Sequence, residues 1–425
     1  MYEDYELNRV GSKYRISILH YKNKENILEK ITYYFTDKFD FTRASRKLDS
    51  INIETRDGKQ RNFWVFVNPI SGKQVAREYF KTILAPAFEF LRMQFEMFET
   101  DSENYLDSFF ERMNMNTMEF TDFVVIGGDG MFNQLLNGIM RHPDSQKLLK
   151  IPIGLMPGGS SNALWWDLDC KDPYLAAINI LRGDSVQGDF FKLDMVDTWK
   201  TFYSTAMTYG FPWDLILESQ SLRNLFGRYR YVATGVKKVL SPASLPDYKS
   251  EIYFKDHSDS SPVEVDSAPV KRKTMSDIST RKPLINLPKV TKIKKRGVSF
   301  CTKNEDKWTK FEYDKFLFYA VATHEIRSSL SEEVVAPFTR INDGNMYIFG
   351  VKDSNKISAL KWVAKVSDGG HLIWDKYFSK KVTELKIKNP EGAHFCIDGE
   401  LFKSSEYNIK LIPRALNLIG RVKGF

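Results

Sequence analysis

Phe123-Val-Val-Ile126, followed by Gly127-Gly-Asp-Gly-Met-Phe-Asn-Gln-Leu-Leu-Asn-Gly138, is the stretch that decides the fold. Four consecutive apolar residues between polar neighbours are typical of a buried strand, and the glycines that follow predict a tight loop. Apolar residues then recur on one face over residues 131–141, which predicts a helix. A strand, a glycine loop and a helix in this order are the unit of a parallel α/β sheet.

The same arrangement occurs once before this stretch and once after it. Phe63-Trp-Val-Phe-Val67 leads into Asn68-Pro-Ile-Ser-Gly-Lys73 and a predicted helical segment over residues 75–98. Ile151-Pro-Ile-Gly-Leu-Met156 leads into Pro157-Gly-Gly-Ser-Ser-Asn-Ala163. Three such units predict a Rossmann-like, three-layer domain over residues 61–190, with helices on both faces of a parallel sheet.

Beyond residue 190 the pattern changes to short strands broken by turn residues. Examples are residues 192–196, 316–322, 346–351 and 384–388. This pattern predicts an antiparallel β-sandwich over residues 191–425, so the fold class is α/β plus all-β with a nucleotide cleft between the two domains. Residues 1–60 alternate polar and apolar side chains around residues 14–20, which suggests strands in an N-terminal extension whose role is not assigned.

The positive charge of the chain is concentrated in one segment. The net charge is +8, yet residues 271–296 alone contain ten Lys or Arg and a single acidic residue, Asp277. The rest of the chain is close to neutral, so the sequence does not predict a basic nucleic-acid-binding fold. Residues 256–296, rich in Ser, Pro, Lys and Arg, are interpreted as a disordered insertion.

The basic insertion has two interpretations. It can be a solvated loop, or it can attach the protein to an anionic membrane surface through its lysines and arginines. Phosphorylation of Ser276, Ser279 or Thr280 would subtract charge from the segment and would weaken such attachment.

Three cysteines, no basic-then-apolar leader and no apolar run near 18 residues suggest a reduced, cytoplasmic setting with at most peripheral membrane association. The six histidines show no metal-ligand spacing.

Each of the three loops has a plain and a chemical interpretation. Residues 127–130 can be an ordinary turn with Asp129 in a turn-favoured position, or a phosphate cradle in which Asp129 acts as a base or a magnesium contact. Residues 157–162 can cap the next helix or bind an anion. The loop ending at Lys73 is too short for a Walker A motif. Because the ends of parallel strands share one crevice, the three loops together favour phosphate binding.

The order Asn-Pro-x-Ser-Gly-Lys, Gly-Gly-Asp-Gly-x-x-x-x-x-x-Asn-Gly and Pro-Gly-Gly-Ser-x-Asn-Ala resembles the diacylglycerol kinase catalytic-domain superfamily, and most closely its sphingosine kinases. The similarity extends from about Phe63 onward. It includes the stretch Tyr209-Gly-Phe-Pro-Trp-Asp-Leu-Ile-Leu-Glu-Ser219, two arginines after it, and Phe395-Cys-Ile-Asp-Gly-Glu400.

The resemblance implies transfer of a phosphoryl group from ATP, with Mg²⁺, to the primary hydroxyl of a sphingoid base. It makes Asp129 the general base and Asp214 the residue that holds the polar head of the lipid. The residues it assigns to the lipid substrate are Asp214, Gly128, Asp129 and Gly130. It also implies that Asp398 and Glu400 approach the nucleotide or its magnesium. The residues it assigns to ATP are Asn68, Pro69, Ser71, Gly72, Lys73, Thr100, Gly127, Gly128, Gly130, Gln134, Gly158, Gly159, Ser160, Ser161, Asn162, Arg223, Arg230, Asp398, Gly399 and Glu400.

Three positions depart from the family pattern. Gln134 stands where a Glu is usual, Ser161 replaces a Gly, and Tyr105 stands where a His is common.

The alternatives are diacylglycerol or ceramide phosphorylation, a soluble-substrate kinase with the same glycine loop, and an inactive lipid-binding relative. Plain interpretations also remain for two features. Arg223 and Arg230 can form a solvated basic helix face, and Asp398-Gly399 is also a good hairpin turn.

Overall fold

The protein is described here by a computed structural model. It describes residues 58–72, 74–102, 104–115, 119–159, 162–218, 248–256, 308–327, 334–366, 369–390 and 393–422, short pieces between 234 and 246, and the backbone of three strands before residue 36. Those three strands, β1 (Tyr2–Asp4), β2 (Tyr14–Lys22) and β3 (Ile27–Phe35), form a small antiparallel sheet of their own. The strand predicted around residues 14–20 is β2.

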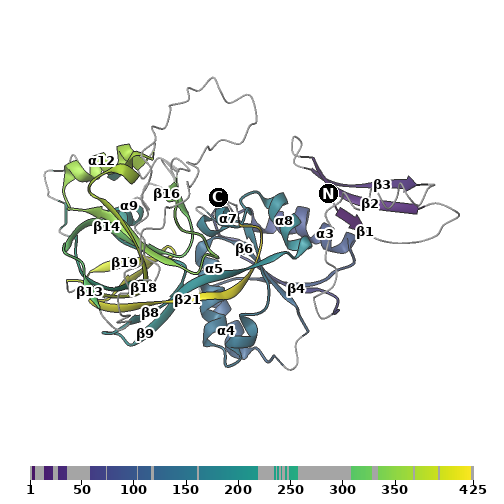
Figure 1. Cartoon of the computed structure of the whole chain (residues 1–425). Helices are drawn as coiled ribbons and strands as arrows, with labels where there is room; N and C mark the ends of the chain where they lie inside the picture. The colour runs from purple at the N-terminus through teal and green to yellow at the C-terminus, as the bar shows by residue number, and fades with distance from the viewer. Residues whose placement is uncertain are drawn as a thin grey trace, which may run out of the picture.

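Four parallel strands form the centre of the first half of the molecule (Figure 1). They are β4 (Asn62–Val67), β5 (Gln94–Glu99), β6 (Asp122–Gly127) and β7 (Ile153–Pro157), in the spatial order β7-β6-β4-β5. Every residue of β6 and β7 is buried, as are five of the six in β4. A parallel strand covered on both faces needs apolar residues at successive positions, which explains the uninterrupted apolar runs of the sequence.

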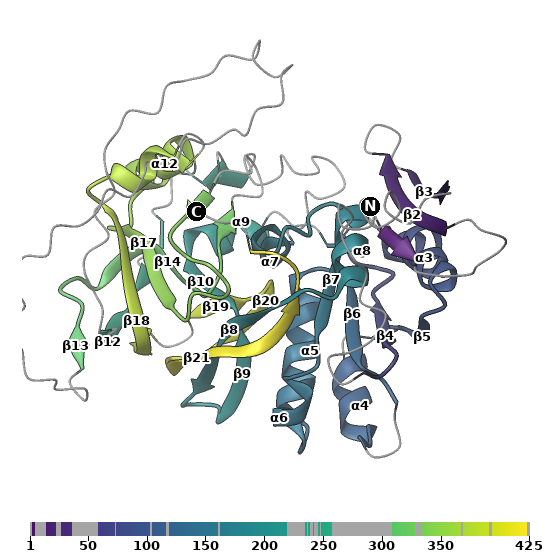
Figure 2. The same cartoon turned by 45° about the vertical axis from the view of Figure 1, so that its right-hand side comes forward.

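Helices cover both faces of this parallel sheet (Figures 1 and 2). On one side lie α2 (Ala76–Tyr79), the π-helix η1 (Phe80–Leu84), α3 (Ala85–Phe90) and α8 (Pro173–Arg182); on the other lie α4 (Tyr105–Arg112) and α5 (Asp129–Arg141). A Cβ on Gly138 would come within 2.5 Å of the Phe110 ring, so α5 can approach α4 this closely only with glycine there. The predicted helix over residues 131–141 is confirmed, with its start two residues earlier.

The helix predicted over residues 75–98 is wrong in its last part. The helical segment ends at Phe90, Arg92 adopts a left-handed φ of 55°, and β5 begins at Gln94. The three-residue spacing of Phe95 and Phe98 imitates a helix, but in a strand it sends the two rings to opposite faces. Phe95 packs on Phe88 with ring centroids 5.4 Å apart, and Phe98 lies 5.0 Å from Phe109. Burying an aromatic ring on each face favours the strand.

The second half of the molecule is an antiparallel β-sandwich, as predicted (Figure 1). Its path runs β20 (Glu400–Lys403), β19 (His394–Ile397), β10 (Ala206–Gly210), β14 (Lys315–Ala322), β17 (Met346–Lys352), β18 (Tyr377–Lys388) and β21 (Glu406–Ile419). Further members are β8 (Ser185–Met195), β9 (Lys200–Ser204), β11 (Tyr248–Lys249), β12 (Glu251–Asp256) and β13 (Thr309–Lys310). The remaining described elements are α6 (Ser145–Leu148), α7 (Ala163–Asp167), α9 (Phe211–Glu218), β15 (Ile326–Arg327), β16 (Val334–Ala336), α12 (Lys356–Val366) and the 3-10 helix η5 (Gly370–Ile373).

Strand β21 belongs to both halves of the molecule (Figure 2, yellow). It pairs antiparallel with β8 and β18, and near its end Leu418 pairs parallel with Ile153 of β7. The ladder with β8 is interrupted between Ile412 and Leu416, where Arg414 has a φ of 52°. This irregularity lets one strand leave the sandwich and close the edge of the parallel sheet.

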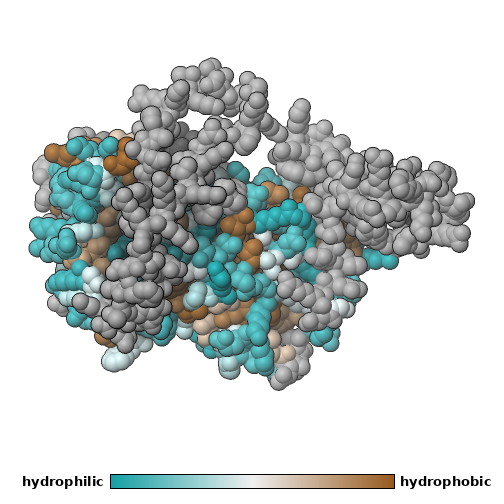
Figure 3. Space-filling model, viewed as in Figure 1, coloured by the Kyte–Doolittle hydropathy of each residue, from teal (hydrophilic) through white to brown (hydrophobic). Residues whose placement is uncertain are grey.

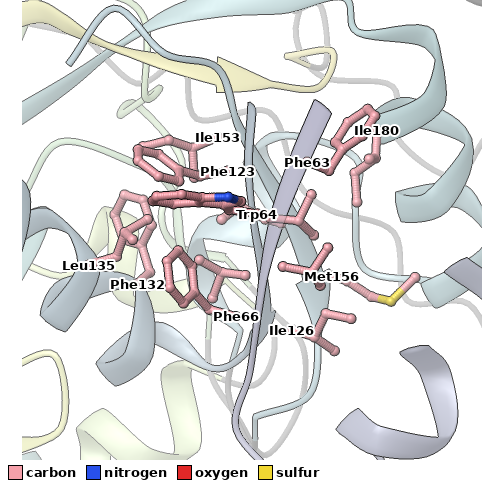
Figure 4. Packing of buried hydrophobic residues seen from close by; sticks show 14 of the residues in the cluster. Phe63, Trp64, Phe66, Phe123, Ile126, Phe132, Leu135, Ile153, Met156 and Ile180 are labelled. Carbon is pink, nitrogen blue, oxygen red and sulfur yellow. The ribbon is translucent and has the colours of Figure 1, made fainter. Parts of the chain in front are cut away.

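Two apolar clusters lie on either side of this connection. The first is centred on the parallel strands and contains a dense group of rings that includes Trp64, Phe66 and Phe123 (Figure 4). The second fills the sandwich around Phe316, Tyr319 and Tyr407. The division of the chain at residues 190 and 191 stays a prediction. In the part of the chain that the structure describes, no helix combines the length and apolarity needed to cross a bilayer.

Candidate active site

The three glycine loops predicted to share a crevice do meet at one edge of the parallel sheet. A Cβ on Gly72 would lie 2.6 Å from the carbonyl oxygen of Gly158, and a Cβ on Gly128 would lie 2.9 Å from the Cα of Gly159. These distances leave no room for side chains, so glycine is required where the loops cross. Gly72 also has a φ of 53°, which side chains with a Cβ rarely adopt.

Backbone hydrogen bonds fix the loops to one another. The amides of Gly158 and Gly159 both donate to the carbonyl of Gly127, at 2.7 and 3.0 Å. The amide of Asn68 donates to Ile126 O at 3.1 Å, so the loop after β4 is tied to the end of β6. Thr100, buried after β5, donates its amide to Val67 O at 2.9 Å. The ends of four strands are therefore joined by backbone hydrogen bonds at one edge of the sheet.

Asn162 closes the loop after β7. Its Oδ1 accepts from the amide of Gly159 at 3.0 Å, and its Nδ2 donates to the carbonyl of the same residue, also at 3.0 Å. Its φ of 50° is left-handed, a conformation that Asn tolerates better than most residues. The side chain thus shapes the loop, and α7 begins directly after it.

Asp129 is the first residue of α5, at the point where the loops meet. Its Oδ1 accepts from the amide of Leu164 at 3.4 Å. Burial raises the pKa of the Asp129 carboxyl above its usual range, and bonds from the backbone of Ala163 and the nearby His324 offset only part of that effect. A carboxyl with a raised pKa at the positive end of a helix is a suitable proton acceptor near neutral pH.

The second half of the molecule contributes a turn to the same place. Asp398 and Gly399 connect β19 to β20, and the carbonyl oxygen of Asp398 lies 3.6 Å from where a Cβ of Gly130 would be. The Asp398 side chain accepts a hydrogen bond from Ser204 Oγ at 2.5 Å. Burial, followed by the negative charge of Asp129, raises the pKa of Asp398 well above the usual value, and the Ser204 hydroxyl opposes this rise. The two carboxyls are therefore close enough to influence one another.

Asn137 is a site residue whose role the sequence did not reveal. It lies two turns along α5 from Asp129 and is buried. Its Oδ1 accepts from Tyr203 N at 3.0 Å, and its Nδ2 donates to Tyr203 O at 2.8 Å. Tyr203 precedes Ser204, the partner of Asp398, so α5 holds the strand that in turn holds the second carboxylate. The Asn-Gly ending of the motif was the available signal for this role.

A buried polar network supports the junction of the two halves. Asp189 is fully buried and accepts from the amides of Gly344 and Arg414, both at 2.7 Å, while burial raises its pKa to about 7. Asp167 accepts from Ile341 N at 2.6 Å and faces Arg340. No local sequence pattern indicates this network, because its members come from separate segments.

Asp214, the predicted lipid head-group residue, lies in α9 and is already paired. It accepts hydrogen bonds from Lys238 Nζ at 3.0 Å and from the hydroxyl of Tyr248. The strand register places β10 between the two sites: Met207 pairs with Ile397 beside Asp398, and α9 starts after Gly210 at the other end. At roughly 3.3 Å per residue, β10 separates the Asp398 turn from the start of α9 by on the order of 13 Å.

The other predicted residues fall into three groups. Pro69, Ser71, Gly127 and Gly128 lie in the meeting loops, and Gln134 is half-buried one turn into α5. Gly399 and Glu400 are exposed at the β19–β20 turn, and Tyr105 begins α4. Lys73, Ser160, Ser161, Arg223, Arg230 and the basic segment 271–296 lie outside the described residues. Within the described residues, no three side chains are grouped as a metal site.

Comparison with known proteins identifies the domain that carries these loops. Residues 62–193 match the diacylglycerol kinase catalytic domain. The segment that carries the three glycine loops is therefore similar to the catalytic domain of a lipid kinase.

Relatives of the chain include kinases of sphingoid bases and of ceramide. Sphingoid long-chain bases kinase 1 of Arabidopsis thaliana is 28% identical over 50% of this chain, and sphingosine kinase 1 of the same plant is 26% identical over 84%. The alignments span 28% and 72% of those two proteins. Mouse ceramide kinase is 27% identical over 44% of the chain and 38% of its own length. A putative diacylglycerol kinase from Bacillus anthracis has the same fold, with a TM-score of 0.54, 15% identity, and coverage of 85% of this chain and 97% of its own.

Proposed function

We propose that the protein is an ATP-dependent kinase that phosphorylates the primary hydroxyl of a sphingoid base. The observation that carries this proposal is the position of Asp129, at the start of α5 where three glycine loops meet the Asp398 turn. In this mechanism the lipid oxygen forms a bond to the γ-phosphorus of ATP, the bond from that phosphorus to the bridging oxygen breaks, and ADP leaves. The hydroxyl proton passes to the Asp129 carboxylate.

Burial of Asp129 suits this role, since it raises the pKa of the carboxyl and so makes the carboxylate a stronger proton acceptor. The N-terminus of α5 adds favourable partial positive charge beside the phosphates. The crossing glycines hold the loops close together, so the nucleotide meets a surface that is already ordered.

Asp398 is the carboxylate at this site that would hold a magnesium ion, while Asp129 stays available as the proton acceptor. The two lie close enough for the charge of Asp129 to raise the pKa of Asp398, and a divalent cation held by Asp398 would offset this repulsion. Mg²⁺ commonly uses one or two carboxylates together with phosphate oxygens, so a group of three protein ligands is not needed. When bound, it neutralises charge on the transferred phosphoryl group.

The pairing of Asp214 favours a second candidate substrate. A carboxylate that already binds Lys238 and Tyr248 would accept the ammonium group of a sphingoid base only by exchanging Lys238. Ceramide or diacylglycerol, which have no free amine, would not require that exchange.

The decisive experiment is an assay of the purified protein with ATP and Mg²⁺ against sphingosine, ceramide and diacylglycerol. We expect phosphorylation of sphingosine in preference to the other two. Asp129→Asn should lower turnover by at least about a hundredfold while ATP still binds, because the general base is lost. Asp107→Asn is the matched control and should retain activity, because this half-buried carboxylate is paired with Arg141 away from the glycine loops. Near-normal turnover of the Asp129 variant contradicts the assigned role.

A further inference from the structure

Helix α12 turns an apolar face away from the protein. Its inner side, formed by Ser358, Ala359 and Trp362, is buried, and the Trp362 ring packs on Phe318 with centroids 4.6 Å apart. Its outer side carries large apolar residues whose exposed fractions are high: Ile357 at 66%, Leu360 at 51% and Val363 at 40%. Ile373, which ends the adjoining η5, is 68% exposed.

Ile357, Leu360 and Val363 lie one turn apart on α12, and Ile373 lies in η5, which contacts α12. We call these four residues and the lysines of the helix, Lys356, Lys361 and Lys365, the α12 surface. In the view of Figure 3 apolar residues gather at the position that α12 occupies in Figure 1. A helix that is apolar on both sides normally has both sides covered. Single exposed apolar residues are ordinary, but a contiguous group of them usually marks a binding surface.

The charges around this surface indicate what binds it. Helix α12 contains three lysines and no acidic residue. Lysine stems can lie along an apolar layer while their ammonium groups reach polar groups above it, as at a membrane surface. Two acidic residues lie near these lysines in the sequence. Asp375 follows Ile373 and is exposed, whereas the charge of Asp353 is offset by an ion pair with Lys376 at 2.5 Å. Lys361 and Lys365 add positive charge to the same helix as the exposed apolar residues, which complements anionic lipid head groups.

The location of the surface favours the same partner. The ammonium group of Lys356 donates to the carbonyl of Ser241, and Ser354 Oγ donates to Pro246 O at 2.9 Å. The α12 surface therefore adjoins the stretch that supplies Lys238, the ion-pair partner of Asp214. Any lipid that reaches Asp214 from a bilayer would come from a membrane close to this surface.

We propose that the α12 surface docks the protein on an anionic lipid bilayer. This inference rests in part on the proposed function, because a kinase whose substrate is a membrane lipid has to reach the bilayer. It is separate from the basic segment 271–296, which lies outside the described residues. A second copy of the chain fits less well, since a two-fold contact through this surface would place lysines against lysines.

The first test measures sedimentation with vesicles of phosphatidylcholine, with and without phosphatidylserine, and without nucleotide or kinase substrate. The full chain should bind the phosphatidylserine vesicles more tightly. The double variant Leu360→Ser, Ile373→Ser should lose on the order of tenfold in partitioning, because two apolar side chains no longer enter the interface. Lys361→Gln should lower partitioning onto phosphatidylserine vesicles by up to about fivefold at low salt, and by less at high salt.

Trp199→Ser is the matched control. Trp199 is 91% exposed and lies between β8 and β9. These two strands are at the opposite end of the sandwich from α12 in both views (Figures 1 and 2). Its removal should leave vesicle binding unchanged, and all variants should unfold at the temperature of the unaltered protein. Unchanged binding of the double variant, or equal binding to neutral vesicles, overturns the proposal.

Two further measurements separate this proposal from its alternatives. If sedimentation velocity without vesicles shows a dimer that the double variant abolishes, the surface binds a second copy and the membrane proposal is wrong. In a chain that lacks residues 271–296, the double variant should reduce vesicle binding by the same factor as in the full chain. Kinase activity toward sphingosine in detergent micelles should be equal in the double variant and the unaltered protein. A protein that binds vesicles through α12 but phosphorylates no lipid would refute the proposed function alone.

Discussion

Asn137 forms two hydrogen bonds with one residue of the other half of the molecule: its Oδ1 accepts from the amide of Tyr203 at 3.0 Å, and its Nδ2 donates to the carbonyl of Tyr203 at 2.8 Å. An amide side chain has one acceptor and one donor group in the geometry needed to replace a strand neighbour at this position. The candidate base at the start of α5 and the strand that holds Asp398 are thereby connected through a single residue.

Replacing Asn137 with Ala should lower the free energy of unfolding by about 2–3 kcal/mol, because two buried backbone groups lose their partners. Chemical denaturation followed by tryptophan fluorescence measures this change. Arg141→Ala, at the end of the same helix, removes an exposed ion pair and should cost less than about 0.5 kcal/mol. Equal losses in the two variants would contradict a connecting role for Asn137.

The hydroxyl of Ser204 controls the protonation of Asp398. Ser204→Ala removes a donor to the carboxylate, so the pKa of Asp398, already raised by burial, should rise further. The acid limb of the kcat/KM profile should consequently move to higher pH, with little effect well above it. Thr201→Ala is a close control, since Thr201 lies on the same strand and donates to another carboxylate, Asp194, at 2.5 Å. An identical shift in both variants would mean that the strand, and not Asp398, causes the effect.

The pair formed by Asp214 and Lys238 distinguishes the two candidate substrate classes. Lys238→Met frees the carboxylate, so the KM for sphingosine should fall several-fold if its amine binds there, while the KM for ATP stays unchanged. Lys237→Met, next to it and exposed, serves as the control. If Lys238→Met lowers the melting temperature and leaves the KM for sphingosine unchanged, the pair is structural and Asp214 does not hold the amine.

Stability should depend on pH through Asp189, whose pKa is raised to about 7 by burial from a usual value of 3.8. Because the folded pKa exceeds the unfolded one, the folded state binds more protons between these two values. The contribution of Asp189 to stability should therefore be fully present below about pH 4 and should be lost as the pH rises to about 7.

The free energy of unfolding should change by at most about 1.4 kcal/mol per pH unit through Asp189. This dependence should level off above the pKa of Asp189 in the folded state. Denaturation of Asp189→Asn measures it, since this variant should show a smaller slope over the same range. Asp343, whose pKa is raised to about 6, contributes in the same direction, and Asp343→Asn separates its share. A variant at Asp189 with an unaltered slope would exclude this group as the cause.

The sequence predicted the features that local pattern determines. The apolar runs before Asn68, Gly127 and Pro157 mark three strand ends, and glycines fix the loops that follow them. It also predicted strands in the sandwich, where turn residues separate short apolar segments. The error at β5 arose because Phe95 and Phe98 have a helical spacing, and only the aromatic residues on both faces of the sheet explain why a strand forms there.

Contacts between distant segments were beyond the reach of such patterns. Asp189 is held by amides from residues 344 and 414, and Asp398 is held by a serine from a strand that precedes it by almost half the chain. Nothing near these residues in the sequence marks the pairing. The ion pair at Asp214 was missed for the same reason, because Lys238 and Tyr248 are separated from it by segments without a recognisable pattern.

Strand β21 has a consequence for how the chain acquires its structure. The outer edge of β7 pairs with β21 through Ile153 and Leu418. During synthesis Ile153 is added early, and Leu418 follows it only after a further 265 positions. During that interval the β7 edge presents unpaired backbone groups of the kind that promote aggregation. Pairing across so large a sequence separation is also slow. We therefore expect the nascent protein to need protection of the β7 edge, and a chain truncated before β21 to accumulate in the insoluble fraction.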